Sequence, residues 1–395
     1  MPVNLNELPE PKPIPLRPKQ KKGVVLPLLI TLLIGLVQRY HSHLFSSLSP
    51  QLKIFILIAP LVIGVIVFSL RLRRYENQRE YAEQWNGVRN ATEAALIDHG
   101  QQPVLLLDTA YHTPLANHNL VKLLSTQQPE LKPIFIEAVG KPLSVRLFSP
   151  SVTTDDSHYY GEQLTLHLKQ ILASLDAQRF TAPCYVRVRH NETVGDMAMR
   201  AAVGRTLKQL QLPFNDVVID HQGDGLMWID SWLDGGISAS LVLSIEIELQ
   251  LSPVAESSEV VSAALIALPH IKQPQHLKPV AAIHRPNRWQ QSEDALPESL
   301  LWGHISQQQP FFVWLSQLSQ EAEVDAVVRL NQDGYLINEK NTHHLDRSLG
   351  KPLSAAGNML LICASEQFNA THQPQLVMLQ DKTAHSGVIR EYQQG

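Results

Sequence analysis

The chain has 395 residues, of which 18% are charged and 44% are hydrophobic, and its formal net charge is −4. This balance offers no basic surface for a polyanion, which argues against nucleic acid as a partner. The two cysteines, Cys184 and Cys363, stand alone in the sequence and form neither a disulfide framework nor a zinc-ligand spacing. We therefore expect two buried thiols, no metal and no cofactor.

Two uncharged apolar runs lie near the N-terminus, at 24–37 and 54–70. The second run is long enough to cross a bilayer as a helix. The first reaches a similar length, as 24–40, when Tyr40 lies at the interface and Lys22 extends toward the headgroups. The sequence thus predicts two transmembrane helices.

A cleaved signal peptide is the alternative explanation of the first run. The basic, proline-rich leader at 1–23 contains Glu7 and Glu10, and no small-x-small cleavage site follows the run. A second apolar run follows closely, which favours a helical hairpin that stays in the membrane.

Lysine and arginine are concentrated outside the two runs. They occur before the first run, sparsely between the runs, and directly after the second: Lys12, Arg17, Lys19, Lys21 and Lys22; Arg39 and Lys53; Arg71, Arg73, Arg74 and Arg79. Because cytoplasmic flanks of membrane helices are enriched in these residues, both termini and the body are predicted to be cytoplasmic. We expect the bacterial inner membrane, and the free cysteines agree with a reducing compartment.

The rest of the chain is predicted to be a helical connector followed by a layered α/β body. Residues 71–100 form the polar connector, which ends at Gly100. Short strands rich in Val, Ile and Leu then alternate with helices. The expected strands are 103–110, 133–138, 143–149, 184–190, 216–220, 239–249, 279–285, 311–316, 325–330, 375–380 and 387–392. The expected helices are 117–127, 161–178, 195–211, 256–268, 294–307 and 353–368. A polar segment at 250–258 suggests two lobes, 101–252 and 253–395.

No common catalytic or nucleotide-binding motif is present. The chain lacks GxxxxGK[ST], GxSxG, HExxH and GxGxxG. The pentapeptide GKPLS occurs twice, at 140–144 and 350–354, but proline follows lysine in both copies, so neither is a phosphate-binding loop. We interpret each copy as a Gly-Pro turn with an exposed lysine. The first lies between two expected strands and the second leads into a helix.

Two further segments could be taken for functional sites, but their residue patterns favour a structural role. The acidic stretch at 220–236 lacks the ligand order of a calcium loop, and we expect Asp224 to cap a short helix that buries Trp232. Ser354 precedes the small residues "AAGN" and is expected to cap the helix that follows.

Two stretches carry a family resemblance. "SEVVSAALIALPHIKQPQHLKPVAAIHRPNRWQ" (258–290) and "HHLDRSLGKPLSAAGNMLLICASEQ" (343–367) resemble an accessory protein family encoded beside type VI secretion phospholipase effectors. The resemblance implies an N-terminal membrane anchor and a cytoplasmic α/β body. It also implies the role of an adaptor that delivers a lipase effector to the secretion machinery.

The C-terminal stretch also resembles the thiolase/ketosynthase fold, in which a helix with a small-residue start, as in "LSAAGN", follows a loop with a histidine. That family needs a nucleophilic cysteine at a helix N-terminus. Cys184 lies in an expected strand and Cys363 inside an apolar helix, so no catalytic residue can be carried over.

The sequence therefore predicts a non-enzymatic adaptor with an α/β, thiolase-like body behind a membrane hairpin. The alternative is a thiolase-fold enzyme that acts on an acyl thioester, with His343 or His344 as the base. Tryptophan is over-represented at interface anchors. The candidates for partner contact are therefore Trp289, Trp302 and Trp314.

Overall fold

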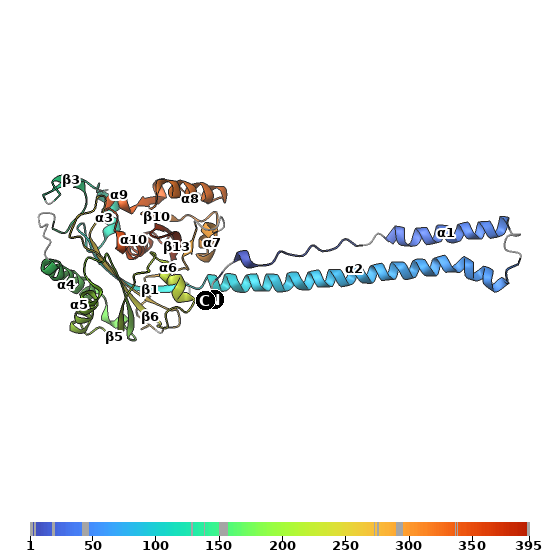
Figure 1. Ribbon diagram of the computed structural model, residues 1–395, viewed down its shortest axis with the longest axis horizontal. Coiled ribbons are helices and arrows are strands. Elements are labelled where there is room, and N and C mark those ends of the chain that lie inside the picture. Colours follow the sequence, from blue (N-terminus) through green and yellow to red (C-terminus); the bar gives the residue numbers. More distant parts are fainter. Residues whose placement is uncertain are drawn as a thin grey trace. The chain divides into compact units, whose positions relative to one another are not determined.

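The computed structural model describes residues 3, 5–17, 20–41, 47–127, 129–137, 139–149, 157–271, 273–274, 276–289, 295–335, 337 and 339–392. Parts of the leader and the centre of the loop between the two apolar runs lie outside these residues. The chain divides into two compact units, Val3–Asp98 and His99–Gly395 (Figure 1). We call the second unit the body.

The N-terminal unit contains a short 3-10 helix, Leu5–Glu7, and two long helices, α1 (Gln20–Tyr40) and α2 (Pro50–Gly100). Helix α2 runs without a break through the second apolar run and the polar segment 71–100. Among the described residues, α2 is the one helix long and apolar enough to cross a membrane, and the apolar part of α1, Val25–Tyr40, is shorter. The structure thus supports one candidate membrane span.

Helices α1 and α2 pack against each other. Gln38 Nε2 donates a hydrogen bond to the Lys53 carbonyl (3.2 Å), and a Cβ on Gly64 would collide with the Pro27 ring. Because Gln38, late in α1, meets Lys53, and Pro27, early in α1, meets Gly64 further along α2, the two helices run antiparallel. Gly64 allows the proline ring to approach the α2 backbone closely.

The proline-rich leader lies along the polar part of α2. The Asn86 side chain accepts a hydrogen bond from Lys12 N (2.8 Å) and donates one to Lys12 O (2.9 Å). The Lys12 ammonium lies 4.0 Å from the Tyr81 ring centre and 4.1 Å from that of Trp85. These contacts hold the leader against residues 81–86 of α2.

The body is built on one eleven-stranded sheet of the described residues, in the order β11-β10-β12-β13-β8-β1-β7-β6-β4-β5, with β9 paired to β13. A separate hairpin consists of β2 and β3. The strands are β1 (Val104–His112), β2 (Pro133–Ile136), β3 (Lys141–Ser144), β4 (Cys184–His190), β5 (Phe214–Ile219), β6 (Leu241–Glu248), β7 (Val260–Ala267), β8 (Ala281–Ile283), β9 (Asn287–Arg288), β10 (Phe312–Ser316), β11 (Thr342–His344), β12 (Gln375–Gln380) and β13 (Ala384–Arg390).

The sheet consists of two halves with the same topology. In the first half the strands run β5-β4-β6-β7-β1, and in the second β11-β10-β12-β13-β8. In both, the first three neighbours pair in parallel and the fourth strand is antiparallel to both of its neighbours. Antiparallel pairing of β1 with β8 joins the halves. The junction follows Ala267, whereas the sequence-based lobe boundary at 252/253 falls before β7.

Three hydrophobic cores among the described residues of the body produce the layers. One core packs α4 (Ser157–Ser174) and α5 (Asp196–Gln209) on the outer face of the first half, and another packs α7 (Ala295–Trp302) and α8 (Gln320–Gln332) on the second. The central core contains α3 (Leu120–Gln127), α6 (Met227–Leu233) and α10 (Ala356–Thr371), which pack against strands of both halves. Figure 1 shows α10 between the two outer helix layers. The layered α/β prediction is confirmed.

Two predicted elements are wrong. The expected helix at 256–268 is strand β7, whose residues are all buried; a continuous apolar run does not by itself distinguish a buried strand from a buried helix. The expected strand at 325–330 lies in α8, which begins where the Ser319 hydroxyl accepts from Ala322 N (3.2 Å) and is followed by Gly334 at φ +83°.

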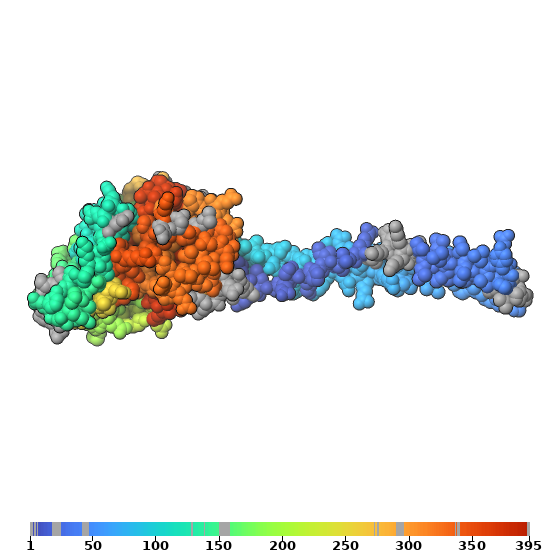
Figure 2. All heavy atoms as spheres, turned by 90° about the horizontal axis from the view of Figure 1, so that it is seen from above, coloured from blue at the N-terminus to red at the C-terminus, as the bar shows by residue number. Residues whose placement is uncertain are grey.

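The two GKPLS copies adopt different structures but meet the same segment. Gly140 (φ +67°) forms the β2–β3 turn and Gly350 (φ +95°) precedes a single bridge from Lys351 to Ser257. The carbonyl of Ser144 accepts from Glu256 N (2.7 Å), and Lys351 N donates to Glu256 O (2.7 Å). The repeat is thus a turn used twice, on two sides of 256–258. In Figure 2 the region around β2–β3 (teal) and α8 (orange) occupy different parts of the surface.

Candidate functional site

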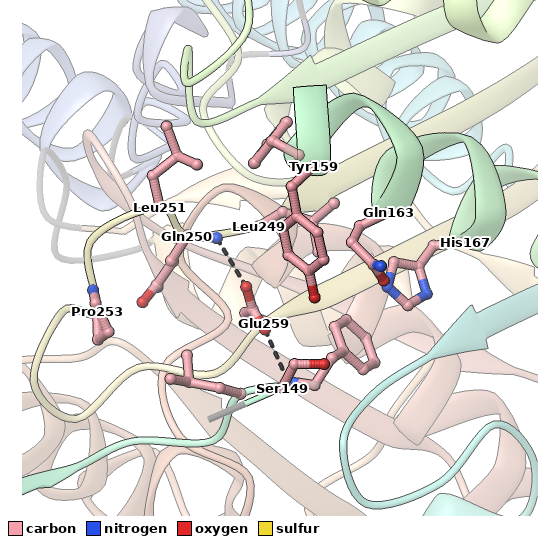
Figure 3. A pocket seen from close by; sticks show the side chains of 12 residues that line it. Ser149, Tyr159, Gln163, His167, Leu249, Gln250, Leu251, Pro253 and Glu259 are labelled. Atoms are coloured by element: carbon pink, nitrogen blue, oxygen red, sulfur yellow. Dashed lines mark hydrogen bonds between the residues drawn. The ribbon is translucent and has the colours of Figure 1, made fainter. Parts of the chain in front are cut away.

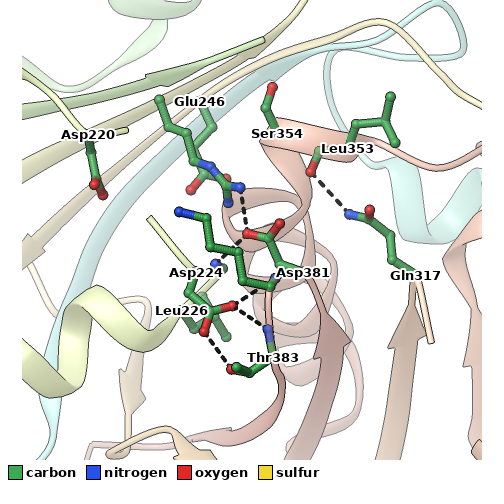
Figure 4. A network of polar contacts seen from close by, with 12 residues as sticks. Asp220, Asp224, Leu226, Glu246, Gln317, Leu353, Ser354, Asp381 and Thr383 are labelled. Carbon is green, nitrogen blue, oxygen red and sulfur yellow. Dashed lines mark hydrogen bonds and ion pairs between the residues drawn. The ribbon is translucent and has the colours of Figure 1, made fainter. Parts of the chain in front are cut away.

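The centre of the body places the N-termini of α6 and α10 beside charged side chains from β4, β6 and the β12–β13 turn (Figure 4). Helix α6 lies in the chain between β5 and β6, and α10 between β11 and β12, so the two helices occupy equivalent positions in their halves. Free N–H groups at such positions attract anions and can hold a reacting oxyanion.

A buried glutamate from the first half caps the helix of the second half. Glu246 on β6 has no solvent exposure, and its Oε2 accepts a hydrogen bond from Asn358 N (2.7 Å) at the start of α10. Its Oε1 accepts from Arg187 Nη1 (3.0 Å), and Arg187 Nε donates to Asp220 (2.7 Å). The charge of Glu246 is therefore paired, and the helix N-terminus is occupied by the protein itself.

An aspartate from the second half caps the helix of the first half. Asp381 follows β12, and its Oδ2 accepts from Gly225 N (2.9 Å) just before α6 and pairs with Arg189 (2.5 Å). The next amide, Leu226 N, donates to His385 Nε2 (3.0 Å), while His385 Nδ1 faces the Thr383 carbonyl (2.9 Å). This pattern requires the Nδ1–H tautomer, and burial lowers the pKa of His385.

Asp224 braces this cap instead of capping α6. Its carboxylate accepts from the Thr383 hydroxyl (2.5 Å) and backbone N–H (3.0 Å) and from Lys382 N (3.1 Å). Burial acts to raise the pKa of Asp224, but the hydrogen bonds from Thr383 together with the nearby His385 and Arg288 lower it by more, so the pKa lies below its usual value. The predicted cap of α6 by Asp224 is wrong, because its side chain is committed to the β12–β13 turn.

The predicted helix cap at Ser354 is also wrong. α10 begins after a 3-10 turn, Leu353–Ala355, and its first residues are not capped by a serine. The Ser354 hydroxyl instead donates to Ile247 O (2.6 Å) and lies 2.7 Å from a Glu248 carboxylate oxygen. The acidic side chains of β6 thus supply the contacts that the sequence pattern assigned to serine.

Neither cysteine lies at a helix N-terminus. Cys184 is the first residue of β4, and burial raises its pKa to about 12. Cys363 lies in the middle of α10 without solvent exposure, and burial raises the pKa of its thiol well above the usual range. Because a reactive cysteine needs a stabilised thiolate, neither is placed as a nucleophile.

The alternative bases, His343 and His344, lie on β11 at the edge of the sheet. The His343 ring stacks on Trp314 with ring centres 4.7 Å apart, and His344 Nε2 lies 3.4 Å from Glu323. Burial lowers the pKa of both imidazoles. Their contacts are with β10 and α8, and neither belongs to the capped centre.

All three tryptophans predicted to contact a partner are core residues. Trp289, Trp302 and Trp314 are between 0% and 1% exposed. Trp302 covers Gly100, where a Cβ would collide with the indole, and Trp314 Nε1 donates to Gln375 (3.1 Å). We correct the prediction of surface anchors: the sequence could not distinguish a core indole from an exposed one.

A small pocket, apart from the capped centre, lies between α4 and the end of β6 (Figure 3). Tyr159, Gln163 and His167 project toward it from α4, and the Glu259 carboxylate accepts from Gln250 N (2.9 Å) and Phe148 N (2.7 Å). Its volume of about 40 Å³ admits only a few water-sized molecules. No group of three or more metal-ligating side chains occurs in the described part of the chain.

Sequence reasoning did not identify Arg187, Glu246, Asp381 or His385 as members of a common centre. One signal was available: two strands rich in Val and Ile carry charges at alternate positions, "YVRVR" in β4 and "SIEIE" in β6. Residues two apart share one face of a strand. Charges repeated on a buried face indicate pairing across the sheet or to a neighbouring helix.

No protein family profile and no curated protein sequence matches the chain. Solved structures do match its shape. The ishigamide ketosynthase/chain length factor aligns over 74% of this chain and 100% of its own, with TM-score 0.52 and 8% identity. A ketosynthase from module 1 of the bacillaene synthase of Bacillus amyloliquefaciens FZB42 aligns over 74% and 76%, with TM-score 0.51 and 10% identity. The body has a thiolase/ketosynthase-like fold.

Proposed function

We propose that this chain is a membrane-anchored, non-enzymatic protein that uses a thiolase-like body to bind a protein partner. The observation that carries the proposal is the reciprocal capping of the central helices. Glu246 and Asp381 accept the N–H groups of Asn358 and Gly225, at which an anionic intermediate would otherwise be stabilised. A fold that fills its own anion-binding positions and places no thiolate there is suited to binding.

The proposed anchor is the α1–α2 pair in the bacterial inner membrane, with both termini and the body in the cytoplasm. Antiparallel packing of α1 on α2 and the docking of Lys12 on Asn86 support a hairpin whose two ends lie on one side of the membrane. The distribution of lysine and arginine supports the cytoplasmic side. An activity reporter fused after Gly395 tests this topology, and periplasmic activity of the fusion would refute it.

The proposed partner is a lipase effector of a type VI secretion system, with the chain as the adaptor that delivers it to the secretion machinery. The support is the sequence resemblance of 258–290 and 343–367. The full-length protein, solubilised in detergent, should capture the effector encoded beside it. Glu256→Ala removes an exposed ion pair with Lys351 and serves as the control for the effects of mutation and purification. We expect this variant to capture the effector as well as the wild type does.

The alternative, an enzyme acting on an acyl thioester, has the fold in its favour. It predicts acyl-thioester turnover that disappears on Cys363→Ala. We expect no turnover above background in the wild-type chain and in this variant. Turnover that depends on Cys363 would overturn the non-enzymatic proposal, whereas failure to capture the effector would overturn only the identity of the partner.

A further inference from the structure

A cleft beside α6 adjoins the capped helix ends and shares Arg187 and Asp224 with them. Strands β4 and β5 form one wall and α6 the other, and the cleft has a volume of about 380 Å³. Its lining combines apolar side chains with two cationic and two anionic ones: Tyr185, Ile219, Met227, Trp228 and Ile237, with Arg187, Arg288, Asp220 and Asp224. A lining of this composition suits a ligand with an apolar group and a polar group.

Two side chains of this cleft carry buried donors without a partner among the described residues. They are Arg187 Nη2 and Trp228 Nε1. Arg187 is 2% exposed and Trp228 is 7% exposed, and the guanidinium carbon lies 4.9 Å from the centre of the indole ring. A buried donor without an acceptor is costly, and native structures rarely tolerate two together. The pair therefore indicates an acceptor from outside the chain.

The charge around the cleft decides the class of acceptor. Arg187 already pairs with Asp220 (2.7 Å) and Glu246 (3.0 Å), and Arg288 lies 3.6 Å from Asp224. Three carboxylates thus face two guanidinium groups, so an added anion would meet an excess of negative charge. A neutral carbonyl oxygen satisfies both donors without this repulsion.

Gly223 lies directly against the unpaired nitrogen. It lines the cleft, and a Cβ built on it would lie 2.9 Å from both Arg187 Nη2 and Asp220 Oδ2. Any side chain at this position would therefore fill the space in front of the guanidinium. Because Gly223 lacks a Cβ, no side chain of its own stands against Arg187 Nη2, a nitrogen that is otherwise buried.

We infer that this cleft binds a secondary amide flanked by an apolar side chain, as presented by an extended segment of a partner protein. Arg187 Nη2 and Trp228 Nε1 donate to the amide carbonyl, and the apolar side chain rests on Tyr185 and Met227. The inference rests on the proposed partner-binding function and places part of the contact surface on β4, β5 and α6.

The test is a titration of the full-length, detergent-solubilised protein, labelled with ¹⁵N at its indole nitrogens, with N-acetyl-leucine N-methylamide. Trp228→Phe assigns the indole signal of Trp228. We expect that signal to shift and saturate with a Kd of about 1 mM, typical of so small a ligand. The indole signals of the core residues Trp289 and Trp302 should stay unchanged. Gly223→Ala should weaken binding at least about tenfold, because its methyl group occupies the space before Arg187 Nη2.

Isovalerate, an apolar anion without an amide, is the matched ligand control and should not shift the signal. Binding of isovalerate without binding of the amide would overturn the neutral-acceptor assignment. So would an unmoved Trp228 signal, or equal affinity of the wild type and Gly223→Ala. If the effector is captured while the amide does not bind, the partner-binding function stands and its surface lies elsewhere. If the amide binds but the effector is not captured, the cleft remains a binding site and the effector is ruled out as the partner.

Discussion

The two halves of the body share a strand order but protect their central helices to different degrees. In the second half, α10 is capped by Glu246, which is inaccessible to solvent and paired with a guanidinium whose side chain is 3% exposed. In the first half, α6 is capped by Asp381, whose side chain is 18% exposed, with a neutral histidine on the next amide. The same topology therefore has one fully buried cap and one partly exposed cap. Removing them should reduce the stability of the fold by unequal amounts.

The largest expected effect comes from Glu246→Ala. This change leaves Arg187 with one of its two carboxylates and leaves Asn358 N without an acceptor in the core. Breaking a buried ion pair from one side costs about 3–5 kcal/mol, so we expect the melting temperature to fall steeply in detergent solution. Glu246→Gln keeps an acceptor for Asn358 N and should recover part of the loss. Equal losses for Glu246→Ala and Asp381→Ala would contradict the difference between the halves.

The two GKPLS copies extend the comparison to the backbone. Both glycines have positive φ, but a Cβ on Gly350 would lie 2.8 Å from the Ser257 carbonyl oxygen, whereas nothing lies within 4 Å of one on Gly140. Gly140→Ala should therefore cost only the conformational term of about 1 kcal/mol, and Gly350→Ala about 2 kcal/mol or more. Thermal melts of the two variants measure the difference. A larger loss at Gly140 would show that the β2–β3 turn matters more than its open surroundings indicate.

The layered α/β class and most strands were predictable, because short apolar runs bounded by Pro, Gly and Asp report local structure directly. The failures have physical causes. Strand β7 is buried on both faces, so its sequence lacks the alternation that identifies a strand. The capped centre depends on pairing Glu246 with Asn358 and Asp381 with Gly225, residues more than a hundred positions apart. Such contacts follow from strand order, which local pattern does not encode.

Asp381→Asn should have a smaller effect than the loss of Glu246. The amide oxygen can still accept from Gly225 N, but the attraction to Arg189 is lost at a site that water partly reaches. We expect a loss of about 1–2 kcal/mol, as for hydrogen bonds to charged groups. High salt should reduce the difference from wild type, because it screens the partly exposed pair. A difference that salt leaves unchanged would show that this cap is as dry as the one at Glu246.

The smallest effect concerns pH and a histidine of the first half. Burial lowers the pKa of His167 to about 4, and its Nδ1 lies 2.8 Å from His112 Nδ1. Below pH 6.5 the unfolded chain then binds more protons than the folded chain. The contribution of His167 to the free energy of unfolding is therefore fully present above that pH and is lost as the pH falls toward 4. The loss should be about 1 kcal/mol at pH 6. His167→Gln should flatten the plot of melting temperature against pH between about 4 and 6.5. The same change at the exposed His118, His118→Gln, should not. An unchanged pH profile in His167→Gln would show that the first half does not hold this imidazole neutral.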